Sequence, residues 1–367
     1  MGDTIVALPA LKWIRNHFGA ESKITLLATQ SPGVEVSSKN LLSDTNYVDH
    51  FLEYPSGINT WMFLISLARL IHTIHRQKFD IVINLAPGQR SKFALLRDRV
   101  FFRLCLIRHH IGFQPFEPQA VYPTKPDGRP APVPSEASFL LERLTASGLA
   151  TGRKITDPLP PPDLMLSPGE LQQAKAWLSA KRNNPERPLV AIAPGVKQPV
   201  NQWPVDRYAA LGSALVQKEC CDLIIVGGSK DRPVQEQLLN HWGTGIGTAG
   251  LFNPRTTAAL LSHCQLFVGP DSGPMHLASA AGIPCVAIFS DRDNPGRWHP
   301  LGQGHEIIRH PVVCGGCGFS ICPRPDHLCM TSVTVSEVLA VVLQQLTRLA
   351  DHAPARPLTT QPLTHNI

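Results

Sequence analysis

Residues 266–289 read LFVGPDSGPMHLASAAGIPCVAIF. The apolar runs 266–268 and 285–289 predict two buried strands. The small residues between them end at Gly282, with Pro284 just beyond, which is typical of a helix C-terminus. Two buried strands joined by a short helix form a parallel unit, so this stretch predicts an α/β protein.

The turn after the first of these strands carries the polar residues. Ser272 or Gly273 can cap the helix, and Pro274 suits its first turn. A helix N-terminus presents free N–H groups and a partial positive charge, which attract phosphate. The turn therefore predicts a pyrophosphate site with Asp271 and His276 as polar contacts. An ordinary strand-to-helix turn, in which Asp271 only caps the helix, is the alternative.

Composition sets the broad class. A length of 367 residues suggests about two domains, and 43% apolar residues is ordinary for a globular chain. The net charge of +6 fits an acidic partner: a nucleotide-sugar, a lipid phosphate or a nucleic acid. Nine cysteines, an odd number, favour a reducing compartment. The start lacks a signal-peptide pattern and no apolar run approaches about 20 residues, so we expect a cytoplasmic protein.

Strand and helix patterns alternate in both halves of the chain. We expect strands at 24–27, 48–52, 79–85, 189–193 and 222–226, and helices at 5–18, 61–75, 91–107, 135–148, 204–218, 233–242, 254–262 and 333–349. Pro9 should kink or restart the first helix. This alternation predicts two facing Rossmann-like domains with parallel sheets. We place them at 1–156 and 169–349, with a proline-rich linker at 157–168 and a disordered tail at 350–367.

Several motifs, in this order, resemble glycosyltransferase family 9, the heptosyltransferases that build the lipopolysaccharide core. The match runs from residue 1 to about residue 346. In the first half it rests on Gly2-Asp3, Ala7-Leu8-Pro9-Ala10-Leu11, FDIVINL at 79–85, Arg90-Ser91 and Ile111-Gly112-Phe113. In the second half it rests on Pro194-Gly195, Trp203-Pro204, Gly227-Gly228 and DSGPMH at 271–276.

The resemblance implies the two-domain GT-B fold and transfer of a heptose from ADP-heptose, with inversion and without a catalytic metal or cofactor. Asp3 would be the general base on the acceptor hydroxyl, although a plain helix N-cap is an alternative role. The expected donor-binding residues are Gly195, Lys197, Asp231, Asp271, Ser272, Gly273, Pro274 and His276, with Asp231 near the ribose.

One position departs from the family pattern. Family members usually carry Lys two residues before the Trp-Pro pair, where this chain has Asn201. The nearest cation is Lys197, which we expect to replace it. If it does not, the donor phosphate would be held less tightly.

A basic segment, 90–108, interleaves arginines with phenylalanines and contains one acid, Asp98. Such a helix can lie on an anionic membrane or bind acceptor phosphates, and we expect Arg90 and Lys92 to contact the acceptor. A solvated helix face is the alternative.

Four cysteines near the C-terminus have the spacing C-x2-C-x4-C-x6-C, with two histidines close by. A tetrahedral structural zinc, free thiols and a disulfide are all compatible with this irregular spacing. The residues are Cys314, Cys317, Cys322, Cys329, His310 and His327.

We therefore expect a GT-B glycosyltransferase, monomeric and cytoplasmic or peripheral on the inner membrane, with a lipopolysaccharide-type acceptor and no nucleic-acid partner. A nucleotide-sugar epimerase and an inactive nucleotide-binding scaffold are the alternatives. We also expect the first strand of the N-terminal domain to be missing, because Gly2-Asp3 already reads as the loop that follows it.

Overall fold

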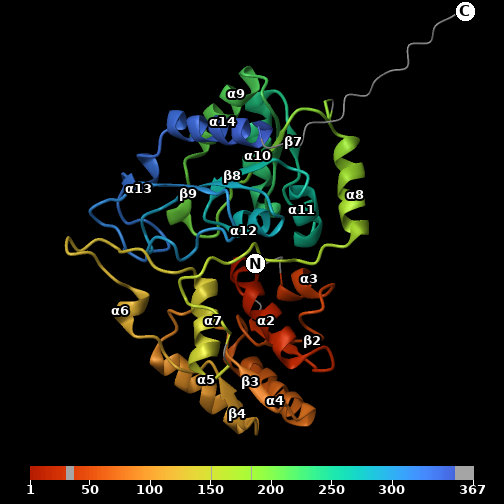
Figure 1. The fold of residues 1–367 in the computed structure, drawn as a ribbon, viewed down its shortest axis with the longest axis vertical. Helices are drawn as coiled ribbons and strands as arrows, with labels where there is room; N and C mark the ends of the chain where they lie inside the picture. Colours follow the sequence, from red (N-terminus) through yellow and green to blue (C-terminus); the bar gives the residue numbers. More distant parts are fainter. Residues whose placement is uncertain (30–36, 150, 183, 352–367) are drawn as a thin grey trace, which may run out of the picture.

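The computed structural model describes residues 1–29, 37–149, 151–182 and 184–351. Two α/β domains follow one another along the long axis of the molecule, and the chain begins at the junction between them (Figure 1). Within the described ranges, no helix combines the length and apolarity needed to cross a membrane.

The C-terminal domain is built on a parallel sheet, as the sequence predicted. Among the described residues the sheet has six strands, because β7 and β10 join the four that were expected. Its strands lie in the order β10-β9-β8-β5-β6-β7. Helices cover both faces, so alternate residues of one strand enter different cores: Leu189 and Ala191 contact one, Val190 and Ile192 the other. The strands are β5 (Leu189–Ile192), β6 (Asp222–Ile225), β7 (Ile246–Gly247), β8 (Leu266–Pro270), β9 (Cys285–Phe289) and β10 (Glu306–Arg309). The helices are α8 (Pro168–Ser179), α9 (Val205–Gln217), α10 (Arg232–Trp242), α11 (Pro254–Leu261), α12 (Gly273–Ala280), α13 (Leu328–Thr331) and α14 (Val335–Asp351), with 3-10 turns η1 (Pro199–Asn201) and η2 (Ser229–Asp231).

The N-terminal domain holds two separate two-stranded parallel sheets, β1–β2 and β3–β4. Among the described residues, no strand is hydrogen-bonded between them, and the expectation of a missing first strand stays a prediction. The strands are β1 (Thr25–Thr29), β2 (His50–Tyr54), β3 (Ile81–Ile83) and β4 (His109–Ile111). The helices are α1 (Gly2–Val6), α2 (Leu8–Phe18), α3 (Ser38–Leu42), α4 (Thr60–Gln77), α5 (Lys92–Leu104), α6 (Pro118–Val121) and α7 (Glu136–Ala146).

Three boundaries differ from those expected. The first helix is two helices that meet at Ala7, because Pro9 lies in the first turn of α2 and restarts it. The linker ends one residue earlier than expected, since Ser167 and Glu170 form a capping box that starts α8 at Pro168. Helix α14 reaches Asp351, and the remainder of the expected tail, 352–367, lies outside the described residues.

One apolar core crosses the boundary between the domains. Ile5 and Leu8 of the N-terminal domain belong to the same buried cluster as Met275 and Leu277 of α12. A smaller cluster joins Val6 to Leu301. Burial of apolar area of this kind holds the two domains face to face.

Two buried arginines of the C-terminal domain reinforce that contact. Arg297 pairs with Glu136 of α7 at 3.1 Å, and both side chains are almost fully buried. Glu136 also accepts a hydrogen bond from the backbone N–H of Gly88. Arg255 pairs with Glu170 at 2.7 Å and donates to the backbone carbonyl of Leu41 at 3.2 Å. Glu136 belongs to α7 and Leu41 to α3, and these two helices lie on opposite sides of the chain's N-terminus (Figure 1).

Replacing Arg297 by Met should lower the free energy of unfolding by about 3–5 kcal/mol, because it leaves the Glu136 carboxylate buried without its partner. Arg348→Ala is the matched control: its pair with Glu306 is half exposed, and we expect a loss below about 0.5 kcal/mol. Chemical denaturation measures both. Adding Glu136→Gln to Arg297→Met should recover part of the loss. Equal losses for Arg297→Met and Arg348→Ala would contradict this account.

Candidate functional site

The site lies at the carboxyl ends of the C-terminal sheet. Asp271 follows β8, Gly195 follows β5, and Asp231 follows β6. Because β8, β5 and β6 are adjacent and parallel, their ends meet at one edge. Ligands of doubly wound folds bind at this edge.

Asp231 fills the space between two strand ends. Its carboxylate accepts a hydrogen bond from the N–H of Gly228 at 2.8 Å. A Cβ atom at Gly195 would lie 2.1 Å from the carboxylate, and one at Gly227 would lie 2.5 Å from it. Both positions therefore need glycine. The structure brings the predicted pair Gly195 and Asp231 together.

Asp271 is held by Asn201, which lies two residues before Trp203. The Asn201 amide donates to the backbone oxygen of Asp271 at 3.2 Å and to its carboxylate at 3.3 Å. Asn201 in turn accepts a bond from Ser290 at 2.6 Å. Burial raises the pKa of Asp271 to about 7, with further contributions from the negative charges of Asp293 and Asp3.

His276 lies in the first half of α12 and is buried. Burial lowers its pKa to about 4, and the nearby positive amine of Met1 lowers it further, so the imidazole is neutral near pH 7. Its Nε2 lies 3.8 Å from the Asp271 carboxylate, which is too far for a hydrogen bond.

Helix α1 of the N-terminal domain meets α12 at this point. A Cβ atom at Gly2 would lie 3.0 Å from the His276 ring, and one at Gly273 would lie 2.3 Å from the methyl group of Met1. Asp3 is exposed in the first turn of α1, and its charge contributes to the raised pKa of Asp271. The contact between the helices thus brings Asp3 near the Asp271–His276 pair.

Lys197 adds a positive charge near Asp3, Asp271 and His276. Lys197 is exposed in the loop after β5, and within the described ranges it makes no ion pair. Its charge acts on the Met1 amine, whose pKa is lowered mainly by burial, while Asp3 opposes the shift. Lys197 therefore lies near the α1–α12 contact and is free to bind an anion.

Two polar atoms beside the site lack partners. The Ser272 hydroxyl and the Gln198 side-chain oxygen are buried without a hydrogen bond within the described part of the chain. Ser272 occupies the N-cap position of α12 but makes no side-chain cap bond. Buried polar atoms are rarely left unpaired, so these two are candidates for contact with a ligand.

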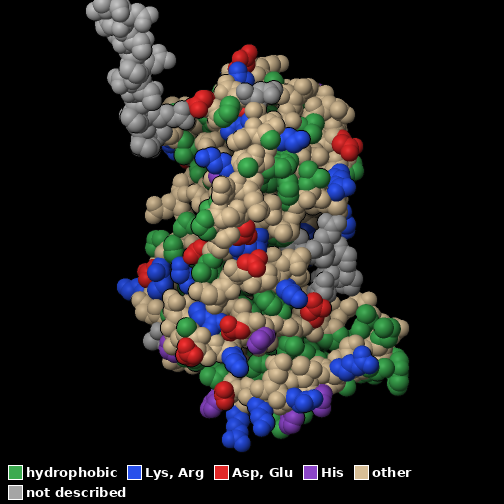
Figure 2. Space-filling view, turned by 90° about the vertical axis from the view of Figure 1, so that its right-hand side faces the viewer, with side chains coloured by type: hydrophobic (Ala, Val, Ile, Leu, Met, Phe, Trp, Pro, Cys, Tyr) green, Lys and Arg blue, Asp and Glu red, His purple; other side chains and the backbone are tan. Residues whose placement is uncertain are grey.

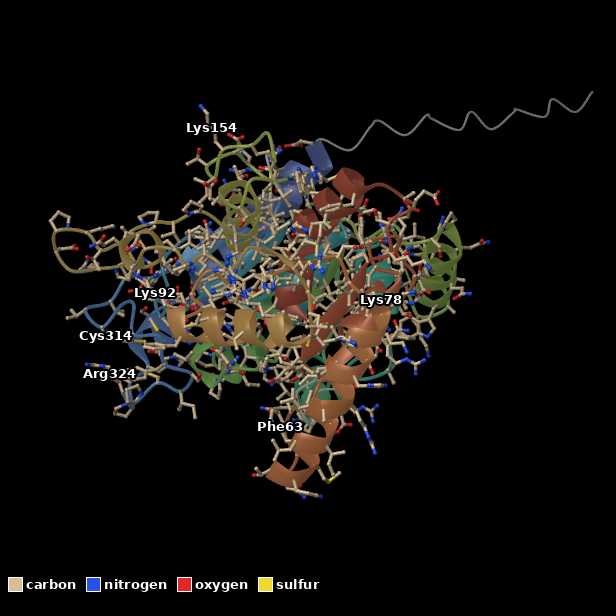
Figure 3. The ribbon with its side chains drawn as sticks, turned by 90° about the horizontal axis from the view of Figure 1, so that it is seen from below. Phe63, Lys78, Lys92, Lys154, Cys314 and Arg324 are labelled. Atoms are coloured by element: carbon tan, nitrogen blue, oxygen red, sulfur yellow. The ribbon has the colours of Figure 1, made fainter. Side chains whose placement is uncertain are left out.

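The predicted acceptor residues lie elsewhere. Arg90 pairs with Asp98 at 2.8 Å, and Lys92 is exposed at the start of α5. Neither makes an ion pair with the Asp271 group among the described residues, and their acceptor role stays a prediction. Figure 3 labels Lys92 on the same side of the molecule as Cys314 and Arg324.

The cysteine cluster does not form a zinc site in this geometry. In the described residues, no group of three or more His, Cys, Asp or Glu side chains is arranged to hold a metal. All four cysteines are free thiols. The two histidines use their rings elsewhere: His310 bonds Ser332 and Glu337, and His327 bonds the backbone of Val200.

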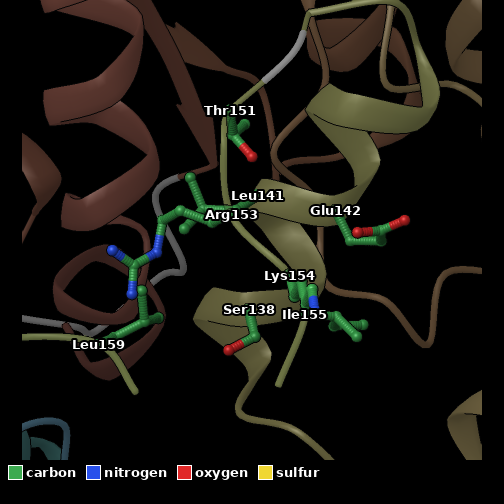
Figure 4. A pocket seen from close by; sticks show the side chains of 8 residues that line it. All are labelled: Ser138, Leu141, Glu142, Thr151, Arg153, Lys154, Ile155 and Leu159. Carbon is green, nitrogen blue, oxygen red and sulfur yellow. The ribbon is translucent and has the colours of Figure 1, made fainter. Parts of the chain in front are cut away.

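Described residues form hollows both beside the site and away from it. One lies beside Asp271 and is lined also by Ser290, Arg292 and Asp293, so it extends the site along the loop after β9. Another, between α7 and residues 151–159, contains none of the predicted site residues (Figure 4).

Sequence reasoning missed the support around Asp271. The sequence pattern indicates only that Asn201 stands where a lysine is expected, and it does not reveal the hydrogen bonds of Asn201 to Asp271. Ser290 and Asp293 were missed as well. They follow the predicted strand β9 directly, and their place at the carboxyl end of a neighbouring strand was the available signal.

Comparison with known proteins identifies the family. The sequence profile of glycosyltransferase family 9 (heptosyltransferase) matches residues 67–317, more than half of the chain. Lipooligosaccharide heptosyltransferase 2 of Haemophilus ducreyi is 32% identical over 168 residues, 43% of this chain and 47% of that protein. Lipopolysaccharide heptosyltransferase 3 of Escherichia coli is 23% identical over 92% of this chain and 96% of that protein. The chain thus aligns with about half the length of the first relative.

Solved structures show the same GT-B fold. The family 9 glycosyl transferase from Veillonella parvula matches with a TM-score of 0.68 at 18% identity, over 95% of this chain and 94% of that one. The E. coli ADP-heptose lps heptosyltransferase II matches with a TM-score of 0.65 at 20% identity, over 94% and 95%. The predicted fold of two Rossmann-like domains is confirmed.

Asp271→Asn should gain stability relative to the wild type as the pH rises from 5 to 8. With a folded pKa of about 7, Asp271 is mainly neutral at pH 5, whereas at pH 8 it is charged in a buried place. As the pH rises from 5, the wild type therefore loses stability until the pH reaches about 7, where the folded carboxyl titrates. The Asn variant has no such loss. We expect the difference in unfolding free energy to shift by about 1–3 kcal/mol toward the variant.

Urea denaturation at the two pH values measures this shift. Asp127→Asn, an exposed carboxylate change, is the control and should show no comparable trend. A difference for Asp271→Asn that is independent of pH would contradict the raised pKa.

Proposed function

This chain belongs to glycosyltransferase family 9, and on that premise we propose that it transfers a heptose from ADP-heptose to a lipopolysaccharide core acceptor. We further propose that the anomeric centre is inverted and that no metal takes part. The relatives are named lipooligosaccharide and lipopolysaccharide heptosyltransferases, which supports the sugar and the acceptor class.

One observation carries the proposal. The contact of α1 with α12 places Asp3 of the N-terminal domain near Asp271 and His276 of the C-terminal domain. A transferase must hold donor and acceptor together, and two domains that meet at polar groups can do so. The acceptor would lie on the Asp3 side and the donor on the α12 side.

The donor diphosphate would bind at the start of α12. The free N–H groups of that helix end and the unpaired Ser272 hydroxyl can donate to phosphate oxygens. Lys197 supplies a cation for the charge that grows on the departing ADP. These groups stabilise the leaving group without a metal.

Asp271 and His276 can both contact an anionic ligand in their neutral forms, so neither side chain need repel it. Asp271, with a pKa of about 7, is partly protonated at neutral pH and can then donate a hydrogen bond. His276 is neutral and keeps one N–H donor. The imidazole would contact the donor as a hydrogen-bonding group rather than as a charge.

Asp3 would act as the general base. The acceptor hydroxyl oxygen attacks the anomeric carbon on the face opposite ADP, and its proton passes to the Asp3 carboxylate. The bond from that carbon to the diphosphate oxygen breaks, and ADP leaves with the electron pair. Asp3 is exposed at the domain junction, where an acceptor could reach it.

The direct test incubates the protein with ADP-heptose and a lipopolysaccharide core acceptor in EDTA, and analyses products by mass spectrometry. We expect ADP and an acceptor one heptose heavier with the inverted anomeric configuration. Consumption of the sugar nucleotide without acceptor would indicate an epimerase instead. Activity that requires added magnesium or manganese would contradict the metal-independent mechanism.

Asp3→Asn should lower kcat by about 10²–10⁴-fold and leave donor affinity nearly unchanged, because the amide cannot accept the hydroxyl proton. Steady-state kinetics and ADP-heptose titration measure the two quantities. Asp127→Asn is the control. A kcat within about twofold of the wild type would remove Asp3 from the mechanism.

Lys197→Ala should lower kcat/KM for the donor by about 10–100-fold, because it removes the cation beside the leaving diphosphate. Lys218→Ala, an exposed lysine after α9, is the matched control and should change kcat/KM less than about twofold. Equal, small effects of the two changes would refute the replacement of the usual lysine by Lys197. If Lys197 does replace it, Asn201→Lys should raise donor affinity.

A further inference from the structure

Helix α5 exposes an apolar stripe that its own domain does not use. Phe93, Leu96, Val100 and Leu104 follow one another at helical spacing, and Phe93 is 86% and Leu104 67% exposed. The opposite side of the helix packs inward through Leu95. An exposed apolar stripe on a helix whose other side is already buried calls for a partner.

Basic residues border this stripe. At 3.6 residues per turn, Arg97 falls on one side of it, whereas Lys92, Arg99 and Arg103 fall on the other. All four are exposed. Arg97 is paired with Asp98, but Arg99 and Arg103 make no ion pair within the described ranges. An apolar stripe between cationic borders is the pattern of a helix that lies in a membrane interface.

Helix α4 extends the same surface. Its first half exposes Trp61, at 72%, and Met62, Leu64 and Ile65, at 37–53%. Both helices pack on one small core, with Leu70 of α4 and Phe101 of α5 in the same cluster. Seen from below, the two helices lie across the near side of the molecule (Figure 3). We call these exposed residues of α4 and α5, with the four basic residues above, the α4–α5 face.

Charge is concentrated in this part of the chain. Residues 54–110 contain nine Lys and Arg and two Asp, a net charge of +7, whereas the whole chain carries +6. The remaining residues therefore sum to −1. Figure 2 shows Lys, Arg and His side chains gathered at this lower end of the molecule. The partner of the face must accept both positive charge and apolar side chains.

We propose that the α4–α5 face docks on an anionic lipid bilayer. Phe93, Leu104 and Trp61 enter the boundary between headgroups and acyl chains, and the arginines bind lipid phosphates. A soluble anion would account for the arginines but not for the exposed apolar stripe. The proposal rests on the proposed function only for its purpose, which is to bring the domain junction to a lipid-borne acceptor.

The test is flotation of the full chain with vesicles, without substrates. We expect binding to phosphatidylethanolamine vesicles containing phosphatidylglycerol, weak binding to neutral phosphatidylcholine vesicles, and release by high salt. Binding that is absent, or equal for both vesicle types, would overturn the proposal. Because no sugar nucleotide is present, the result stands whether or not the proposed transfer occurs.

Three paired variants locate the surface. Arg99→Gln with Arg103→Gln should weaken binding by about thirtyfold, and Phe93→Gln with Leu104→Gln by at least about tenfold. Lys175→Gln with Leu251→Gln, exposed positions of the other domain, should bind like the wild type. Equal losses in all three pairs would place the contact elsewhere. Circular dichroism checks that each variant is folded.

Two further measurements separate the remaining outcomes. All variants should keep wild-type transfer to a water-soluble core oligosaccharide, since none of the changed residues is among the predicted donor, acceptor or catalytic residues. If the α5 variants dissociate a dimer in sedimentation and leave vesicle binding unchanged, the face joins two copies of the chain and the membrane proposal is wrong.

Discussion

The ion pair of Arg297 with Glu136 is the contact on which the relation between the two domains depends. Both side chains are buried, so each charge is tolerable only while the other is present. Glu136 also binds the backbone of Gly88, in the loop after β3, so one carboxylate joins that loop to the C-terminal domain. With Arg255 on the far side of the junction, this pair keeps α1 seated against α12. Where these two helices meet, Asp3 of the N-terminal domain lies near Asp271 and His276 of the C-terminal domain.

Two kinds of positive character meet at the candidate site. A helix end and Lys197 supply attraction for phosphate, while burial keeps His276 neutral and raises the pKa of Asp271 to about 7. Asn201 fits this arrangement, because its amide holds Asp271 by hydrogen bonds and introduces no charge. A lysine at the same place would favour the charged form of Asp271. Asparagine rather than lysine at position 201 therefore leaves the site with one cation fewer and also favours the neutral form of the Asp271 carboxyl.

The sequence predicted four strands of the C-terminal sheet, because buried parallel strands such as 189–193 are continuous apolar runs, and this one ends at Pro194. It also placed Asp271 and His276 correctly beside a helix start. The short edge strands β7 and β10 were not predicted, since segments of two to four half-buried residues show no clear periodicity. The bonds of Asn201 and the Glu136–Arg297 pair escaped for a different reason: they join residues 70 and 161 positions apart, which no local pattern reveals.

The two buried arginines also bear on how substrates come and go. Arg297 pairs across the junction with Glu136, and Arg255 donates across it to the carbonyl of Leu41. A rotation that widens the side of the junction at α7 must therefore separate the Arg297 guanidinium from the Glu136 carboxylate, while the Arg255 contact can serve as a pivot. Such a rotation exposes the buried charges of this pair, and water must solvate them before the domains can move further apart. Product departure would then be governed by solvation of a guanidinium–carboxylate pair as much as by the affinity of the site for the product. Catalytic turnover and resistance to unfolding would share a barrier.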